Sequence, residues 1–256
     1  MNKVKYGKIK CANPDSSIYA VTIQMLIRMK PLVNKQQSFF EKYPKPDIPL
    51  SIIDVYEQMS SKKKYLDIDP FIHLMKKIDL KDVNNHFSDF LSYILNIIDP
   101  SNNKKGIMSE QICFRIQKSC IFNISLKNNI KLSTIIQDQY DFSKMIDKKA
   151  YFIFFHPLYN KEIRLNIDLK ILHESNYILS IVIAKKIRGK HRNCFVLFLN
   201  SQNSQKVNQN NDLNQWIKID EDFKPIKSDR EVFEKISNQD KYQIELFGYC
   251  QNPEKN

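Results

Sequence analysis

Hydrophobic residues in the first hundred positions recur every three or four residues, which is the spacing of one face of a helix. The pattern predicts helices over residues 17–30, 50–60, 69–77 and 84–99. The last of these has the strongest pattern, with apolar residues at Phe87, Phe90, Leu91, Ile94, Leu95 and Ile98. Pro31 ends the first helix, and the prolines of "EKYPKPDIP" (41–49) predict an irregular connector after it.

After residue 107 the pattern changes to the alternation that is typical of strands. β-branched and aromatic residues are enriched in the segments 111–126, 150–157, 161–169, 176–187, 193–200, 215–220 and 242–250. Because consecutive parallel strands need a helix between them, helices followed by strands favour an α+β fold with a mostly antiparallel sheet. We expect residues 1–256 to form a single domain, with the polar stretch 200–215 as a long flexible loop between two strands.

Composition excludes several classes of site. The chain has only four glycines, which lie far apart, so no glycine-rich phosphate-binding loop is present and no cofactor is expected. Its five cysteines form no C-x-x-C pair, which argues against a structural zinc site. With no signal peptide and no apolar run of about 18 residues, we expect no membrane association and a nuclear or cytoplasmic location.

The net charge of +12 favours acidic partners, nucleic acid first. However, the lysines are scattered along the chain, and the abundance of Lys, Asn and Ile is also what a compositional bias towards AT-rich codons produces. Direct RNA binding by an α+β module therefore stays open as one interpretation of the charge.

The first predicted helix begins in "NPDSSIYAVTIQML" (13–26), where small polar residues crowd the first turn. The unpaired N–H groups of a helix start suit a thiolate or an oxyanion, although a capped surface helix has the same composition. Far along the chain, His191 precedes one predicted strand and Asp220 ends the next. Two such residues become neighbours when their strands pair antiparallel, as a general base and its orienting carboxylate often do.

Read together, these stretches resemble the ubiquitin-specific protease family of cysteine peptidases. The N-terminal pattern of that family is Asn-x-Gly-Asn-Thr-Cys-Tyr-x-Asn-x-x-Leu-Gln-x-Leu. Aligned on Gln24 and Leu26, it places the nucleophile at Ser17. The second helix of the family, Gln-Asp-Ala-x-Glu-Phe-Leu-x-x-Leu-Leu-Asp, is similar to "NHFSDFLSYILN" (85–96).

The likeness is strongest over residues 177–250. There the family has Tyr-x-Leu-x-Ala-Val, Gly-His-Tyr-x-x-Tyr, Trp-x-x-Phe-Asp-Asp and Tyr-x-Leu-x-Tyr. This sequence matches them in order with Tyr177-Ile178-Leu179, His191, Phe195, Trp216, Ile219-Asp220 and Tyr242 to Tyr249. The resemblance implies a papain-like fold with a helical, thumb-like part at about 10–100 and a β, palm-like part at about 107–250.

The resemblance also implies a triad at Ser17, His191 and Asp220, but the departures from the family predict an inactive protein. A thiol is a far better nucleophile at neutral pH than the hydroxyl of Ser17. The oxyanion-side Asn of the family falls at Ala12, and losing one such donor costs about a hundredfold or more in rate. Lys190 and Arg192 flank His191 in place of Gly and Tyr, and nearby cations lower the basicity of an imidazole.

A second departure concerns ubiquitin. Family members grip it with a fingers subdomain, often held by zinc, whereas here only about 50 residues separate the helix at 84–99 from the strand at 150–157. The fingers are therefore expected to be reduced, Cys113 and Cys120 to be buried strand residues, and ubiquitin binding does not carry over. The expected role is a protein-interaction scaffold, a pseudo-deubiquitinase among the protein subunits of an RNA–protein complex.

Two inactive members of the family share the lost thiol and a similar helix exit, matched here by Gln24, Leu26, Pro31 and Leu32. One belongs to the spliceosomal tri-snRNP and the other to the poly(A)-nuclease deadenylation complex, so splicing and mRNA turnover are both implied, with a slight preference for splicing. The alternative is an active deubiquitinase or related hydrolase that uses Ser17 or Cys11 with His191 and Asp220.

Overall fold

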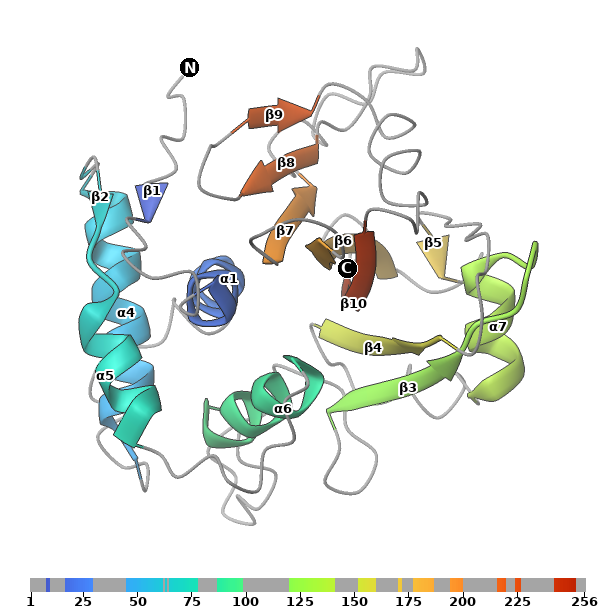
Figure 1. Ribbon diagram of the computed structural model, residues 1–256, viewed down its shortest axis with the longest axis horizontal. Helices are drawn as coiled ribbons and strands as arrows, with labels where there is room; N and C mark the ends of the chain where they lie inside the picture. The colour runs from blue at the N-terminus through green and yellow to red at the C-terminus, as the bar shows by residue number, and fades with distance from the viewer. Residues whose placement is uncertain are drawn as a thin grey trace.

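Helices cover both faces of a central β-sheet in the computed structural model of the chain (Figure 1). The structure describes residues 8–9, 17–29, 45–61, 63, 65–77, 87–98, 120–140, 152–159, 170–171, 177–186, 194–199, 216–219, 224–226 and 242–251. The strands at 194–199, 216–219 and 224–226 are described by their backbone alone. None of the helices in these ranges combines the length and the apolar character that a membrane-spanning helix needs.

The main sheet is mixed, with antiparallel pairs in the majority among the described strands. Its strands run in the order β3-β4-β10-β6-β7-β8-β9, and β5 pairs with the start of β6. Their bounds are β3 Ile121–Ser125, β4 Phe152–Leu158, β5 Lys170–Ile171, β6 Tyr177–Lys186, β7 Cys194–Leu199, β8 Trp216–Ile219, β9 Lys224–Ile226 and β10 Tyr242–Gln251. A separate parallel pair joins β1 (Lys8–Ile9) to β2 (Tyr65–Leu66). The α+β prediction is thus confirmed.

The N-terminal helices lie close to where the sequence predicts them. They are α1 (Ser17–Leu26), α4 (Asp47–Ser60), α5 (Asp69–Lys77) and α6 (Phe87–Ile98). The first ends before residue 30 because its last turn tightens: Arg28 N–H donates to the Met25 carbonyl at 3.1 Å, three residues back. The second begins inside the predicted connector, since Pro49 falls in the first turn, where a helix needs no N–H donor.

One helix and one parallel pair are not anticipated by the sequence pattern. Helix α7 (Leu132–Gln139) lies within the β-rich half of the chain, between β3 and β4, which pair parallel. The two findings have one cause, because a parallel pair requires a crossover, and α7 is part of it. Its apolar residues Leu132, Ile135 and Ile136 follow helical spacing, but β-branched isoleucines favour strands when they are taken one by one.

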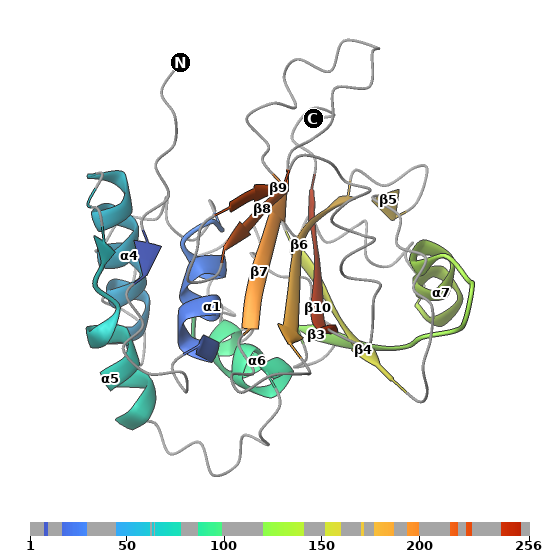
Figure 2. The same ribbon diagram turned by 45° about the horizontal axis from the view of Figure 1, so that its top comes forward.

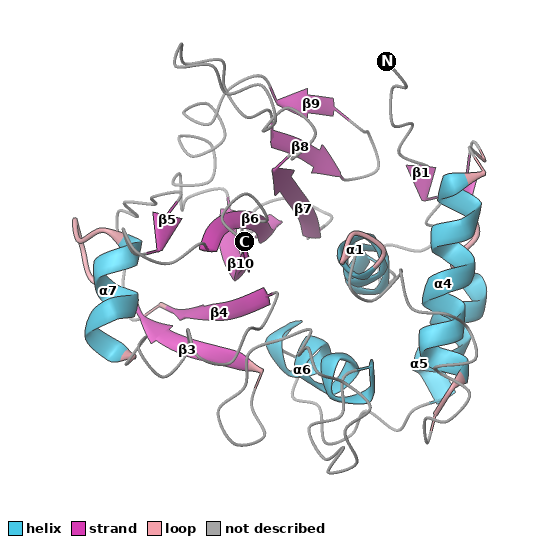
Figure 3. Cartoon of the chain, turned by 180° about the vertical axis from the view of Figure 1, so that it is seen from behind, coloured by secondary structure: helices cyan, strands magenta, loops and turns pink. Residues whose placement is uncertain are grey.

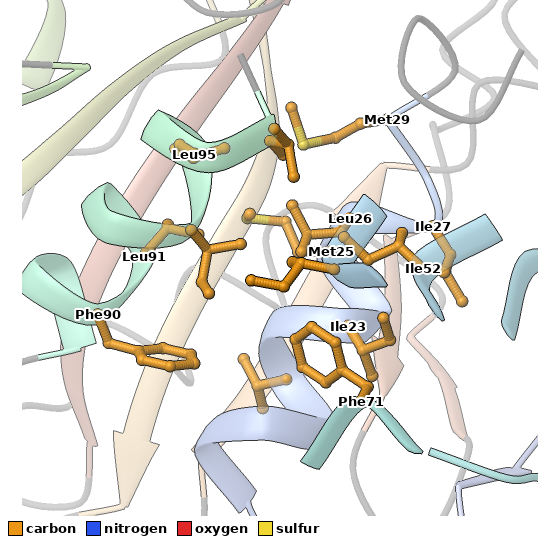
Figure 4. Packing of buried hydrophobic residues seen from close by; sticks show 14 of the residues in the cluster. Ile23, Met25, Leu26, Ile27, Met29, Ile52, Phe71, Phe90, Leu91 and Leu95 are labelled. Atoms are coloured by element: carbon orange, nitrogen blue, oxygen red, sulfur yellow. The ribbon is translucent and has the colours of Figure 1, made fainter. Parts of the chain in front are cut away.

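The two faces of the sheet bury separate hydrophobic cores, with α1, α4, α5 and α6 on one side and α7 on the other (Figures 2 and 3). Alternation along each strand produces this division: on β4, Phe154 joins the helical side and Phe155 joins the α7 side. Helix α1 is central to the larger core. Figure 4 shows its Met25 and Leu26 among side chains that include Leu91 of α6.

Gly248 lies where β10 closely approaches side chains of both neighbouring strands. It lies on β10 opposite Phe154 of β4 and Ile181 of β6. A Cβ at this position would lie 2.9 Å from a ring carbon of Phe154 and 3.0 Å from the Cβ of Ile181. Both distances are shorter than normal carbon contacts, so glycine allows the Phe154 ring to lie over the backbone of β10.

We expect Gly248→Ala to lower the free energy of unfolding by about 1–3 kcal/mol, because the added methyl group overpacks a full core. Urea denaturation measures the change. Phe154→Leu provides the control, since the smaller side chain makes room for the methyl group. On that background Gly248→Ala should cost less than in the wild type. Equal costs on both backgrounds would show that the close contact is not the cause.

Candidate functional site

Helix α1 begins at Ser17, the residue that the family pattern places at the nucleophile. Ser17 is the first residue of the helix, so its backbone lies at the end where the N–H groups have no partner within the helix. The helix packs against β7 of the main sheet (Figure 2). Ser17 therefore occupies the local backbone setting that the hypothesis requires, while its side chain is outside the described part of the structure.

The pairing of β7 with β8 brings two further segments together. Val196 pairs with Ile219, so the N-terminal end of β7 and the C-terminal end of β8 lie side by side. His191 precedes β7 in the sequence and Asp220 directly follows β8. The predicted antiparallel pairing of their strands is confirmed. His191, Asp220, Cys11 and Ala12 are outside the described residues, so their roles stay predictions.

The buried polar residues of α1 bond to the helix itself or to the turn that follows it. Thr22 Oγ1 donates to the Ile18 carbonyl at 2.8 Å. Gln24, which anchors the family pattern, is almost fully buried, and its side-chain oxygen accepts a short hydrogen bond from Arg28 Nη1. The same nitrogen lies 2.6 Å from the Gln24 carbonyl oxygen. Gln24 thus helps to hold the guanidinium of Arg28 beside the last turn of α1.

Helix α6 corresponds to the second family motif and packs against α1. The rings of Tyr19 and Phe90 meet edge to face at 5.4 Å between centroids. Elsewhere on α6, the hydroxyl of Ser92 lies 3.7 Å from the thiol of Cys120, which is fully buried. The expected burial of Cys120 is confirmed, but the residue lies in a bend just before β3 and not within a strand, and Cys113 is outside the described part.

The third family block forms the centre of the sheet, where β6 pairs with β10. Tyr177 begins β6 and is buried in the core on the side of α7. Burial, with a smaller electrostatic effect of Cys250, raises the pKa of Tyr177 to about 12. Tyr177 therefore stays neutral at physiological pH, as a buried packing residue does. Trp216 is the first residue of β8, and its side chain is outside the described part.

A polar cluster on β4 and β10 is not anticipated by the sequence. His156 Nδ1 lies 2.8 Å from the carbonyl oxygen of Glu245, and the hydroxyl of Tyr159 accepts a hydrogen bond from Ile244 N–H at 3.0 Å. Burial raises the pKa of Tyr159 above its usual value, and the charge of Glu245 adds to the effect. These bonds hold an irregularity in the pairing of β10 with β6, between Ile244 and Leu246. The signal in the sequence is a polar residue that interrupts each apolar strand.

Among the described residues, no group of three or more His, Cys, Asp or Glu side chains is arranged to hold a metal ion. The buried polar groups of α1, and those between β4 and β10, instead bond to neighbouring backbone and side chains. Their geometry is that of structural support for the sheet and its helical cover.

Comparisons with known proteins identify the fold. No protein-family model matches the sequence, and no curated protein matches it. Among solved structures, the fold is similar to the Saccharomyces cerevisiae PAN2 pseudoubiquitin-hydrolase, with a TM-score of 0.67 and 10% sequence identity. The match covers 98% of this chain and 88% of that chain. The similarity therefore extends over both the helical and the β-rich halves of the chain. At this low sequence identity, it shows a shared fold and not a shared function.

The role of Gln24 is open to direct measurement. Gln24→Leu keeps the size of the buried side chain but removes the oxygen that accepts from Arg28, so the free energy of unfolding should fall by about 1–3 kcal/mol. Gln137→Leu, at an exposed position of α7, is the control and should stay within about 0.5 kcal/mol of the wild type. A Gln24→Leu variant as stable as the wild type would contradict the structural role.

Proposed function

We propose that the chain is a catalytically inactive, ubiquitin-specific-protease-like domain that acts as a protein-interaction scaffold within a complex that processes or degrades mRNA. The observation that carries the proposal is the position of Ser17. The whole chain has a fold similar to that of a pseudoubiquitin-hydrolase, and helix α1 begins at Ser17, the residue that the family sequence pattern aligns with the nucleophile.

Chemistry at that place supports inactivity. The family reaction depends on a thiolate that a neighbouring imidazole activates, and a serine hydroxyl is protonated at neutral pH and much less nucleophilic. Ala12 removes the oxyanion-side amide, and Lys190 and Arg192 add positive charge next to His191 in the sequence. The three changes affect attack, charge stabilisation and proton transfer, and each of them lowers the rate of the family reaction.

The fold comparison supports the inactive branch of the family. The matched protein is itself described as a pseudoubiquitin-hydrolase. Of the two inactive members that the sequence resembles, the one in the poly(A)-nuclease complex therefore gains support relative to the splicing factor. We infer that this chain likewise binds protein subunits and keeps a papain-like arrangement of α1, β7 and β8 without turnover. The net charge of +12 suits a place beside RNA in such a particle.

We expect the wild-type chain to resist covalent capture by ubiquitin that carries a thiol-reactive electrophile at its C-terminus. We expect the same with a fluorophosphonate probe, because Ser17 lacks the activation that a serine nucleophile needs. Labelling is followed by mass spectrometry, with an active ubiquitin-specific protease as the positive control.

His191→Ala and Cys11→Ser decide between the proposal and an active hydrolase. Labelling that disappears in His191→Ala would show a functioning imidazole and overturn the proposal. If Cys11→Ser also abolishes it, the nucleophile is the thiol of Cys11. Equal and negligible labelling of the wild type and both variants is the result expected of a scaffold.

A further inference from the structure

The edge of the main sheet at β3 is occupied by side chains of the chain itself. Among the described strands, β3 ends the sheet on the side away from β10. Leu126 N–H is directed at the Leu158 carbonyl, 3.5 Å away and just beyond the paired residues. Since backbone groups alternate in direction along a strand, those of Asn123 and Ser125 point away from β4.

Helix α7 supplies partners for these outward groups (Figure 3). Ser125 N–H donates to Gln139 Oε1 at 3.1 Å, and Gln139 Nε2 donates to the Ser125 carbonyl at 3.0 Å. The hydroxyl of Tyr140 donates to the Asn123 carbonyl at 2.5 Å. A primary amide carries one donor and one acceptor side by side, as a peptide group does, so Gln139 takes the place of a residue on a neighbouring strand.

These partners are held in place by packing. The ring of Tyr140 lies edge to face with Phe122 of β3, at 5.4 Å between centroids, and 6.1 Å from the ring of Phe155. Leu132, Ile135 and Ile136 of α7 are buried in the smaller core. The contact between Gln139 and Ser125 is therefore fixed by apolar anchors on both sides of it.

An unpaired strand edge is a template for another chain, and proteins protect such edges by several devices. We propose that the outer edge of β3 at Asn123–Ser125 is a strand-addition site that Gln139 and Tyr140 close, and that it pairs with the same edge of a second copy when they are removed. Two identical edges complement each other about a two-fold axis. The exposed side chains of Asn123 and Ser125 are uncharged, so the two copies do not repel each other there.

The test compares variants of the full chain by analytical ultracentrifugation across a range of concentrations. Gln139→Ala combined with Tyr140→Phe should shift the average mass from that of a monomer towards twice that value as concentration rises. Gln137→Ala, two residues before Gln139 at another exposed position of α7, is the control and should remain monomeric. Thermal unfolding by circular dichroism checks that the variants are folded.

Gln139→Lys separates edge pairing from general destabilisation. It also removes the amide, but it places a charge that opposes strand addition, so this variant should stay monomeric. Hydrogen exchange supplies a second measurement: the Ser125 amide should exchange about tenfold faster in the double variant at low concentration and regain protection in the dimer. A monomeric double variant, or a Gln139→Lys variant that associates equally, would overturn the proposal.

Discussion

The structure depends on β10, a central strand that is paired on both sides and buried on both faces. It lies between β4 and β6, and its side chains alternate between the two cores, with Leu246 on the helical side and Phe247 on the side of α7. Gly248 allows the neighbouring strand to bring an aromatic ring across its backbone. Because residues of β10 enter both cores, neither core is complete without this strand.

This arrangement separates the packing of α1 from the first residue of the helix. Helix α1 is held by Ile23, Met25 and Leu26, which are fully buried, and by the contact of Tyr19 with Phe90. These contacts come from residues that follow the helix start. Under the proposal that Ser17 takes the place of the family's cysteine, the core of α1 is built from other residues, so that a change of nucleophile leaves these contacts in place.

Much of the fold can be predicted from the sequence, because the residues on the buried face of a helix or strand recur at a regular spacing and are apolar. The helix at 69–77 is predicted to the residue, and the strand at 176–187 within one residue at each end. Helix α7 is missed because its isoleucines favour a strand when they are taken one by one, whereas its helical conformation is decided by packing in the core that contains Tyr177 and Phe155.

For the candidate site, the sequence predicts the helix start at Ser17 and the pairing of β7 with β8. Whether the side chains of Ser17, His191 and Asp220 come together stays a prediction, because none of the three side chains is in the described part of the structure. The polar residues His156 and Glu245 stand out in their apolar strands, but the hydrogen bond between them could not be predicted, since it joins residues 89 positions apart at a local irregularity of β10.

The proposed role of this domain is to bind other proteins and not to catalyse a reaction. The most direct test is to purify the chain from its native source, as the wild type and as His191→Ala, and to measure which proteins accompany each and in what ratio. We predict the same protein subunits in the same stoichiometry for both, with no change in ubiquitin conjugates. Accumulation of ubiquitin conjugates with His191→Ala, or a wild-type chain that purifies alone, would contradict the account.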